Sequence, residues 1–137
     1  MKRKLLTGGL IALAFFQSCS DDDKGTPSLS GRYGMVSHEI SSCTDATKNK
    51  LTQCPSTVRC RDLEFLADGK VNIHYSTATH PGTYVIAQNQ LVLDDNYYST
   101  PFTTLYTVSA DGNKLTLTRQ DTDTGAACME KEIYNKM

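Results

Sequence analysis

The sequence has few of the features that carry enzyme chemistry. It contains no tryptophan and only three histidines, His38, His74 and His80. No Gly-x-Ser-x-Gly, His-Glu-x-x-His or glycine-rich phosphate-binding motif accompanies them. His38 and His74 lie in alternating segments, where a polar residue ordinarily faces solvent or a barrel lumen. We therefore expect no enzymatic activity, no cofactor and no metal centre.

The chain also lacks an excess of positive charge. Its 14 basic and 15 acidic residues give a formal net charge of -1. If Lys2, Arg3 and Lys4 are removed with a signal peptide, 14 minus 3 leaves 11 basic against 15 acidic residues, a net charge of -4. Because nucleic-acid-binding proteins present a basic patch, no nucleic-acid partner is expected.

The longest apolar run lies near the N-terminus, from Leu5 to Phe16, directly after the basic residues Lys2 to Lys4. A membrane-spanning helix needs about 20 apolar residues, so this shorter run is typical of a signal peptide. Ser18 and Cys19 at its end resemble a bacterial lipobox, in which cleavage precedes a cysteine that carries diacylglycerol. The resemblance implies a lipoprotein signal peptide over residues 1–18 and lipidation of Cys19. A Cys19 that forms a disulfide after ordinary secretion is the alternative.

An acidic segment directly follows that cysteine and consists of Ser20, Asp21, Asp22 and Asp23. It resembles the export tag that sends lipoproteins to the cell surface in one large group of Gram-negative bacteria. The resemblance implies a lipid-anchored outer-membrane protein exposed at the surface. A solvated linker on a protein that faces the periplasm is the alternative. Residues 19–30 show no apolar periodicity, so we expect a flexible tether before the domain.

The remaining residues, 31–137, show strand periodicity and no comparable helical stretch. In the segment KVNIHYS, the apolar Val71, Ile73 and Tyr75 alternate with polar residues. Such alternation is typical of a half-buried strand, and it recurs along the domain. It predicts eight strands, near residues 31–41, 59–66, 70–77, 82–87, 90–94, 102–109, 114–120 and 127–134.

The predicted connections between these strands differ in length in a regular way. If neighbouring strands run antiparallel, the short turns lie at one end of the domain, at residues 67–69, 88–89 and 110–113. The longer loops then lie at the other end, at residues 42–58, 78–81, 95–101 and 121–126. This sorting is expected of an eight-stranded antiparallel up-and-down barrel with one closed and one open end.

Three segments, GRYGMVSHEI, GTYVIAQNQLVLDD and FTTLYTVSADGNKLTLTR, resemble the lipocalin-like domains of small Gram-negative bacterial surface lipoproteins. The resemblance covers residues 31–137 and implies an all-β barrel with a long, lid-like first loop. Lipocalins typically carry Gly-x-Trp in their first strand, whereas this chain has Gly31-Arg32-Tyr33 there. Tyr33 is therefore expected to fill the closed end, and the ligand residues of the family do not carry over.

If Cys19 is lipidated, an even set of cysteines remains, which suits an oxidising compartment: Cys43, Cys54, Cys60 and Cys128. All four lie at the predicted open end. In a closed barrel the last strand lies beside the first, which favours Cys43 with Cys128 and Cys54 with Cys60. Pairing of Cys43 with Cys54 is the alternative. A zinc site formed by cysteines and His80 is a further alternative.

Two classes of function remain open. In the first, the barrel mouth binds a small or partly apolar ligand through residues such as His80, Tyr97, Tyr98 and Phe102. In the second, the barrel is filled and its loops contact another cell-envelope protein. An enclosed apolar cavity would favour the first and a filled lumen the second. The acidic pairs Asp94–Asp95 and Glu130–Glu132 are expected at exposed edges.

Overall fold

The computed structural model describes residues 26–55, 60–96, 102–121 and 125–137. The predicted lipidation site Cys19 and the acidic segment 20–23 therefore lie outside the described residues, as do Tyr97 and Tyr98. Within the described ranges, no helix is long and apolar enough to cross a membrane. These ranges contain nine strands and two short 3-10 helices.

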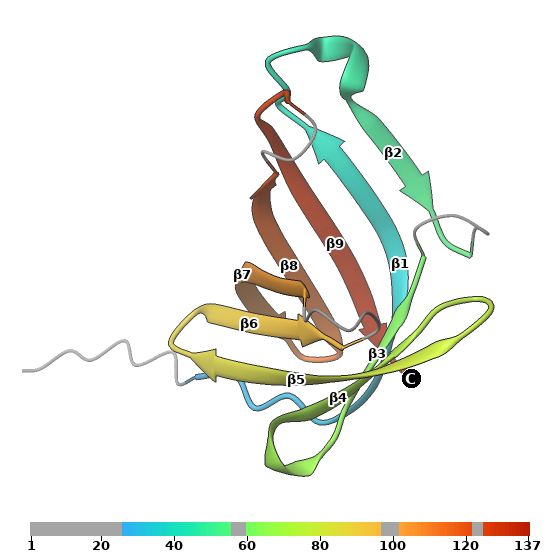
Figure 1. The fold of residues 1–137 in the computed structure, drawn as a ribbon, viewed down its shortest axis with the longest axis vertical. Coiled ribbons are helices and arrows are strands. Elements are labelled where there is room, and N and C mark those ends of the chain that lie inside the picture. The colour runs from blue at the N-terminus through green and yellow to red at the C-terminus, as the bar shows by residue number, and fades with distance from the viewer. Residues whose placement is uncertain (1–25, 56–59, 97–101, 122–124) are drawn as a thin grey trace, which may run out of the picture.

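The eight predicted strands are all present. They are β1 (Gly31–Ser41), β3 (Asp62–Phe65), β4 (Lys70–His74), β5 (Thr79–Ala87), β6 (Gln90–Asp95), β7 (Phe102–Asp111), β8 (Lys114–Asp121) and β9 (Cys128–Lys136). Each is antiparallel to its neighbours in chain order, and β1 also pairs with β9. The cyan β1 and the red β9 lie side by side in Figure 1. The prediction of an eight-stranded antiparallel up-and-down barrel is confirmed.

The short turns and the long loops lie at opposite ends of this barrel, because every pairing is antiparallel. One short turn, between β3 and β4, is the 3-10 helix η2 (Ala67–Gly69). Gly69 has a φ of 69°, and a Cβ atom there would lie 2.9 Å from the carbonyl oxygen of Tyr84. Only glycine fits such a turn without strain, so the Asp68-Gly69 pair fixes this hairpin at the closed end.

The first long loop contains structure that the sequence did not predict. It forms the 3-10 helix η1 (Ala46–Lys48) and an additional strand, β2 (Lys50–Gln53). β3 pairs with residues 31–34 of β1, and β2 pairs with residues 37–40 along the same edge. Figure 1 shows β2 beside the C-terminal part of β1. The segment expected to form a lid therefore extends the barrel wall.

Two disulfides tie together the open end of the barrel. Cys43 pairs with Cys128, which joins the segment after β1 to the start of β9, and Cys54 pairs with Cys60. These are the favoured pairings, which are therefore confirmed, and the Cys43–Cys54 alternative is wrong. The zinc site built from cysteines is also wrong, because all four sulfur atoms are bonded. Each disulfide contributes about 2–4 kcal/mol, and the one that closes the longer loop contributes more.

The lower part of the barrel, which we call the closed half, is filled by apolar side chains that point inward. None of these residues is more than 4% exposed: Tyr33, Leu63, Phe65, Val71, Ile73, Leu91, Val108, Leu115 and Leu117. Phe65 packs edge-to-face against both Tyr33 and Tyr84, with ring centroids 5.7 and 4.9 Å apart. Tyr33 thus fills the closed end as expected. Each fully buried leucine or valine stabilises the fold by about 1.5–3 kcal/mol.

Candidate ligand site in the open half of the barrel

The upper part of the barrel, which we call the open half, contains a cavity of about 250 Å³. The side chains that line it come from five strands, β1, β6, β7, β8 and β9, and from the segments next to β3 and β4. They are His38, Arg61, Tyr75, Leu93, Asp95, Phe102, Thr104, Tyr106, Arg119, Glu130 and Glu132. Five of these side chains are charged, two positive and three negative, so the lining differs sharply from the apolar closed half.

A bulge in β1 turns His38 into this cavity. Tyr33 and Met35 point inward near the start of the strand, and strict alternation would place residues 37 and 39 inward as well. The register with β9 shifts between Met35 and Ser37, where Val36 is the extra residue. After this shift His38 lies directly opposite Glu132 and is 3% exposed. A bulge that inserts one residue therefore redirects the side chain that follows it.

His38, Glu130 and Arg119 form one group of interacting side chains. His38 Nε2 contacts Glu130 Oε1, and Arg119 Nε donates a hydrogen bond to Glu130 Oε2. Burial alone would raise the pKa of Glu130, but the hydrogen bond from His38 and the charge of Arg119 outweigh it. The pKa of Glu130 is therefore below its ordinary value, and the side chain is a carboxylate at neutral pH.

Arg61, Glu132, Tyr106 and Tyr134 form a second group, which closes the bottom of the cavity. Arg61 Nη2 lies 3.0 Å from Glu132 Oε2 and 2.9 Å from the Tyr106 hydroxyl. The Tyr134 hydroxyl donates to the same Glu132 oxygen at 2.6 Å. Because Arg61 directly follows the Cys54–Cys60 disulfide, the disulfide anchors the short segment that brings the guanidinium inside.

The protonation states of this second group follow from burial and charge. Burial would lower the pKa of Arg61, but the Glu132 carboxylate outweighs it and raises that pKa well above its usual value. Burial raises the pKa of Tyr106 to about 12, and it raises the pKa of Tyr134 well above the ordinary value of 10.0. At neutral pH the group therefore holds one buried ion pair and two neutral phenols.

Two of the predicted ligand residues, Phe102 and His80, lie in different positions relative to the cavity. Phe102 lines the cavity and is 56% exposed, so its ring stands at the rim. His80 is 9% exposed and packs against Tyr75, with ring centroids 4.8 Å apart. Its Nδ1 atom lies 3.6 Å from Asp95 Oδ1. His80 thus supports Tyr75 and Asp95, which reach the cavity, and does not line the cavity itself.

The prediction that Glu130 and Glu132 mark an exposed edge is wrong. They are 6% and 4% exposed and point into the barrel. The prediction is also wrong for Asp95, which lines the cavity, while its neighbour Asp94 bonds Thr103 on the outer face. The segment CMEKEIY does place Glu130, Glu132 and Tyr134 on one face. That pattern could have identified the inner face if the buried Tyr134 had been used to orient it.

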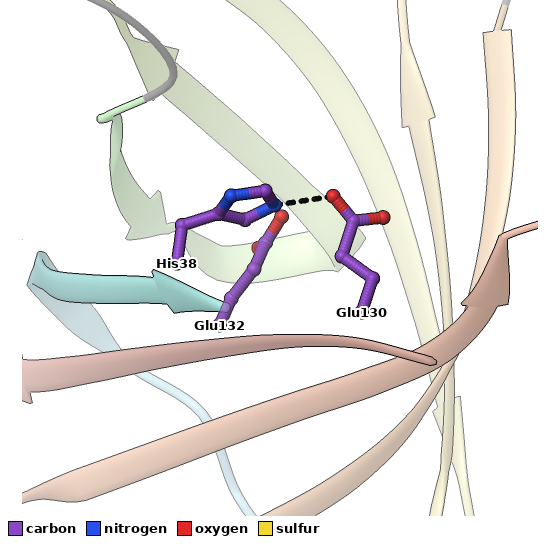
Figure 2. A group of neighbouring side chains, drawn as sticks. All are labelled: His38, Glu130 and Glu132. Atoms are coloured by element: carbon purple, nitrogen blue, oxygen red, sulfur yellow. Dashed lines mark hydrogen bonds and ion pairs between the residues drawn. The ribbon is translucent and has the colours of Figure 1, made fainter. Parts of the chain in front are cut away.

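One subset of the lining has the donor types of a metal site. Single donor atoms of His38, Glu130 and Glu132 all lie within 4.8 Å of one another. Figure 2 shows the imidazole of His38, from β1, with its Nε2 atom directed toward the carboxylates of Glu130 and Glu132, from β9. No protein-family model, curated protein or solved structure matches this chain. The chemistry of the site therefore has to be argued from its own side chains.

Proposed function

We propose that this chain is a membrane-anchored, surface-exposed lipoprotein whose lipocalin-like barrel binds one small, partly apolar ligand in its open half. The observation that supports this proposal is the cavity of about 250 Å³ above a closed half that apolar side chains fill. Eight-stranded barrels have room for one small ligand when part of the lumen is free of side chains. The cavity supplies that room.

The lining indicates the kind of ligand. Pockets for drug-sized molecules usually measure about 300–1,000 Å³, so this cavity suits a smaller molecule. Leu93, Phe102 and Tyr75 offer apolar contact area, whereas Arg61 and Arg119 offer donors that are already shared with carboxylates. A ligand with a short apolar part and one or two polar groups fits such a mixed lining.

The anchor determines which way the cavity faces. The predicted tether, residues 19–30, enters β1 at Gly31 at the closed end of the barrel, and its Leu29 is buried in the core, so the flexible part ends before that residue. A lipid on Cys19 would therefore place the open half away from the membrane. Replacing Cys19 with alanine should move the protein from the membrane to the soluble fraction. A variant that is still cut at this position and partitions with membranes as before would contradict the anchor.

Surface display rests on the acidic segment Asp21 to Asp23. Replacing these three residues with alanine should leave the protein in the membrane fraction but protect it from protease added to intact cells. The unchanged protein should be removed by the same treatment. If protease removes neither form, or removes both equally, the acidic segment is not an export tag.

A structural or interaction lipoprotein is the alternative function. Val85 and Leu105 are 65% and 54% exposed on the outer face, and Val92 lies between them in register. This short apolar row is an observation that favours contact with another cell-envelope protein. The alternative expected a filled barrel, whereas the open half keeps a cavity, which supports ligand binding; its lining is partly charged, unlike the enclosed apolar cavity expected from the sequence.

Filling the cavity tests the proposed ligand site. Thr104 lines the cavity, whereas Thr107 on the same strand is exposed on the outer face. Native mass spectrometry of the full-length chain purified from its cells should show an added small-molecule mass. Thr104→Trp should abolish this mass, and the matched control Thr107→Trp should keep it. Retention of the same mass by Thr104→Trp, or no added mass in the unchanged protein, would contradict the proposal.

A further inference from the structure

Three donor side chains converge in the open half from two paired strands. His38 lies opposite Glu132 in the β1–β9 ladder, and Glu130 follows two residues before Glu132 on the same face. All three are buried, with exposed fractions of 3%, 4% and 6% for His38, Glu132 and Glu130. Buried groups of this kind on neighbouring strands are held in place by the sheet, so their convergence is a fixed feature of the fold.

The arrangement suits a metal ion more than it suits a salt-bridge network alone. Glu130 already pairs with Arg119, and Glu132 already pairs with Arg61, so each carboxylate has its own cation. Both ion pairs are complete without His38, yet the bulge in β1 brings the Nε2 atom of this imidazole close to both carboxylates. The two arginines and three carboxylates of the lining, including Asp95, sum to -1, which favours a cation.

The hydrogen-bond partners of the two carboxylates fix their orientation, as the hydrogen-bond partners of metal ligands do. Arg119 holds Glu130 Oε2, which leaves Oε1 directed toward His38. Tyr134 and Arg61 hold Glu132 by hydrogen bonds of 2.6 and 3.0 Å to Oε2. Hydrogen bonds that fix the orientation of a ligating carboxylate raise metal affinity, and their loss typically costs about 10–100-fold.

We infer that His38, Glu130 and Glu132 bind one divalent transition-metal ion in the open half of the barrel. One imidazole and two carboxylates suit Zn²⁺, Fe²⁺ or Mn²⁺, whereas Ca²⁺ and Mg²⁺ prefer oxygen donors alone. Zinc bonds to nitrogen and oxygen measure about 2.0–2.2 Å, so donors on one ion lie at most about 4.4 Å apart. A small rotation of the side chains from their present spacing within 4.8 Å meets this limit.

The coordination positions that His38, Glu130 and Glu132 leave open on the ion would face the cavity. This inference rests on the proposed ligand site, because a polar group of the ligand could occupy one of those positions. The cavity beside the three donors has about 250 Å³ for such a group or for water. A site with three protein ligands and an open position differs from a closed structural zinc site, which has four protein ligands.

Calorimetric titration of the purified, chelator-treated full-length chain with Zn²⁺ tests the inference. The unchanged protein should bind one ion per chain, and His38→Gln should weaken binding at least about tenfold. The matched control is His74→Gln, because His74 also contacts a glutamate, Glu64, at 3.0 Å but lies on the outer face of β4. It should bind as the unchanged protein does. Absence of binding, or equal binding by His38→Gln, would overturn the inference.

A second measurement covers the case in which His38→Gln does not fold. Crystals of the unchanged protein soaked in Zn²⁺ should show an anomalous peak within bonding distance of His38 Nε2. A peak only at surface carboxylates such as Asp45 or Asp111, or no peak, would overturn the inference. If the metal tests fail while Thr104→Trp still abolishes the added mass, the ligand cavity stands and the metal site alone is wrong.

Discussion

The closed and open halves of one barrel are built from the same strands but have opposite chemistry. On β8, Leu115 and Leu117 point into the closed half, and Arg119 on the same face points into the open half. On β9, Tyr134 ends the closed half, and Glu132 and Glu130 follow above it. The inner faces of β8 and β9 therefore change from apolar to charged toward the open end.

This difference separates stability from binding. The closed half buries apolar area, which is the dominant favourable contribution to folding. The open half buries charges, whose mutual attraction is largely offset by the cost of removing them from water. If the barrel served stability alone, apolar side chains would be expected to fill the open half as well. The charged lining is better explained by a site that binds something.

Breaking the buried ion pair between Arg61 and Glu132 should have the largest effect on the free energy of unfolding. Arg61→Met leaves the Glu132 carboxylate buried without its cation, which should destabilise the protein by about 3–5 kcal/mol. Adding Glu132→Leu should recover most of that loss, because two apolar side chains then extend the closed half upward. Chemical denaturation of both variants measures these changes in the free energy of unfolding.

An exposed ion pair is the control for this experiment. Arg32 pairs with Asp62 at 2.7 Å, but the two side chains are 45% and 29% exposed. Arg32→Met should therefore change the free energy of unfolding by less than about 1 kcal/mol. If Arg32→Met loses as much stability as Arg61→Met, the cost does not come from burial of the ion pair in the open half. The same conclusion holds if the double variant Arg61→Met, Glu132→Leu is no more stable than Arg61→Met alone.

A substitution that creates a new cavity in the apolar closed half should have the next largest effect on the free energy of unfolding. Leu91 is fully buried in the apolar core, so Leu91→Ala should destabilise the protein by about 2–5 kcal/mol. Zinc binding to the folded variant should not change, because Leu91 lies outside the cavity lining. Denaturation and zinc titration of the same sample separate the two effects. Loss of zinc binding in a folded variant would show that the halves are coupled.

Alkaline pH should weaken the fold through the phenols at the boundary of the two halves. Burial raises the pKa of Tyr106 from 10.0 to about 12, so the folded state retains a proton that the unfolded state loses. The contribution is present below pH 10 and is lost as the pH rises toward 12, by about 1–3 kcal/mol. Tyr106→Phe should reduce this pH dependence in denaturation measured from neutral to alkaline pH. An unchanged slope would contradict the assignment.

The sequence predicted the barrel because the relevant signals are local. Alternation of Val71 with Ile73, and of Leu115 with Leu117, identifies strands, and glycine turns such as Asp68-Gly69 identify hairpins. Closure of the barrel then follows from strand number and connection lengths. The β2 strand was missed because its four residues carry little periodicity.

The site was harder to predict because its position depends on tertiary register. The bulge at Val36 changes which face of β1 is inside, and nothing in the local alternation marks it. On β9, Met129 and Ile133 occupy the face opposite Glu130 and Glu132, so hydrophobicity alone favoured the wrong face as the inner one. Charged residues turned into a lumen break the pattern on which strand prediction depends.

Paramagnetic broadening in a nuclear magnetic resonance spectrum of the full-length chain tests the central claim most directly. Substoichiometric Mn²⁺ should broaden the backbone amide signals of His38, Glu130 and Glu132 first. It should leave those of Leu63 and Leu91 in the closed half sharp. This result would place a cation in the charged upper lumen and nowhere in the apolar lower one. Equal broadening of both halves, or broadening only at exposed carboxylates on the outer surface, would contradict the account.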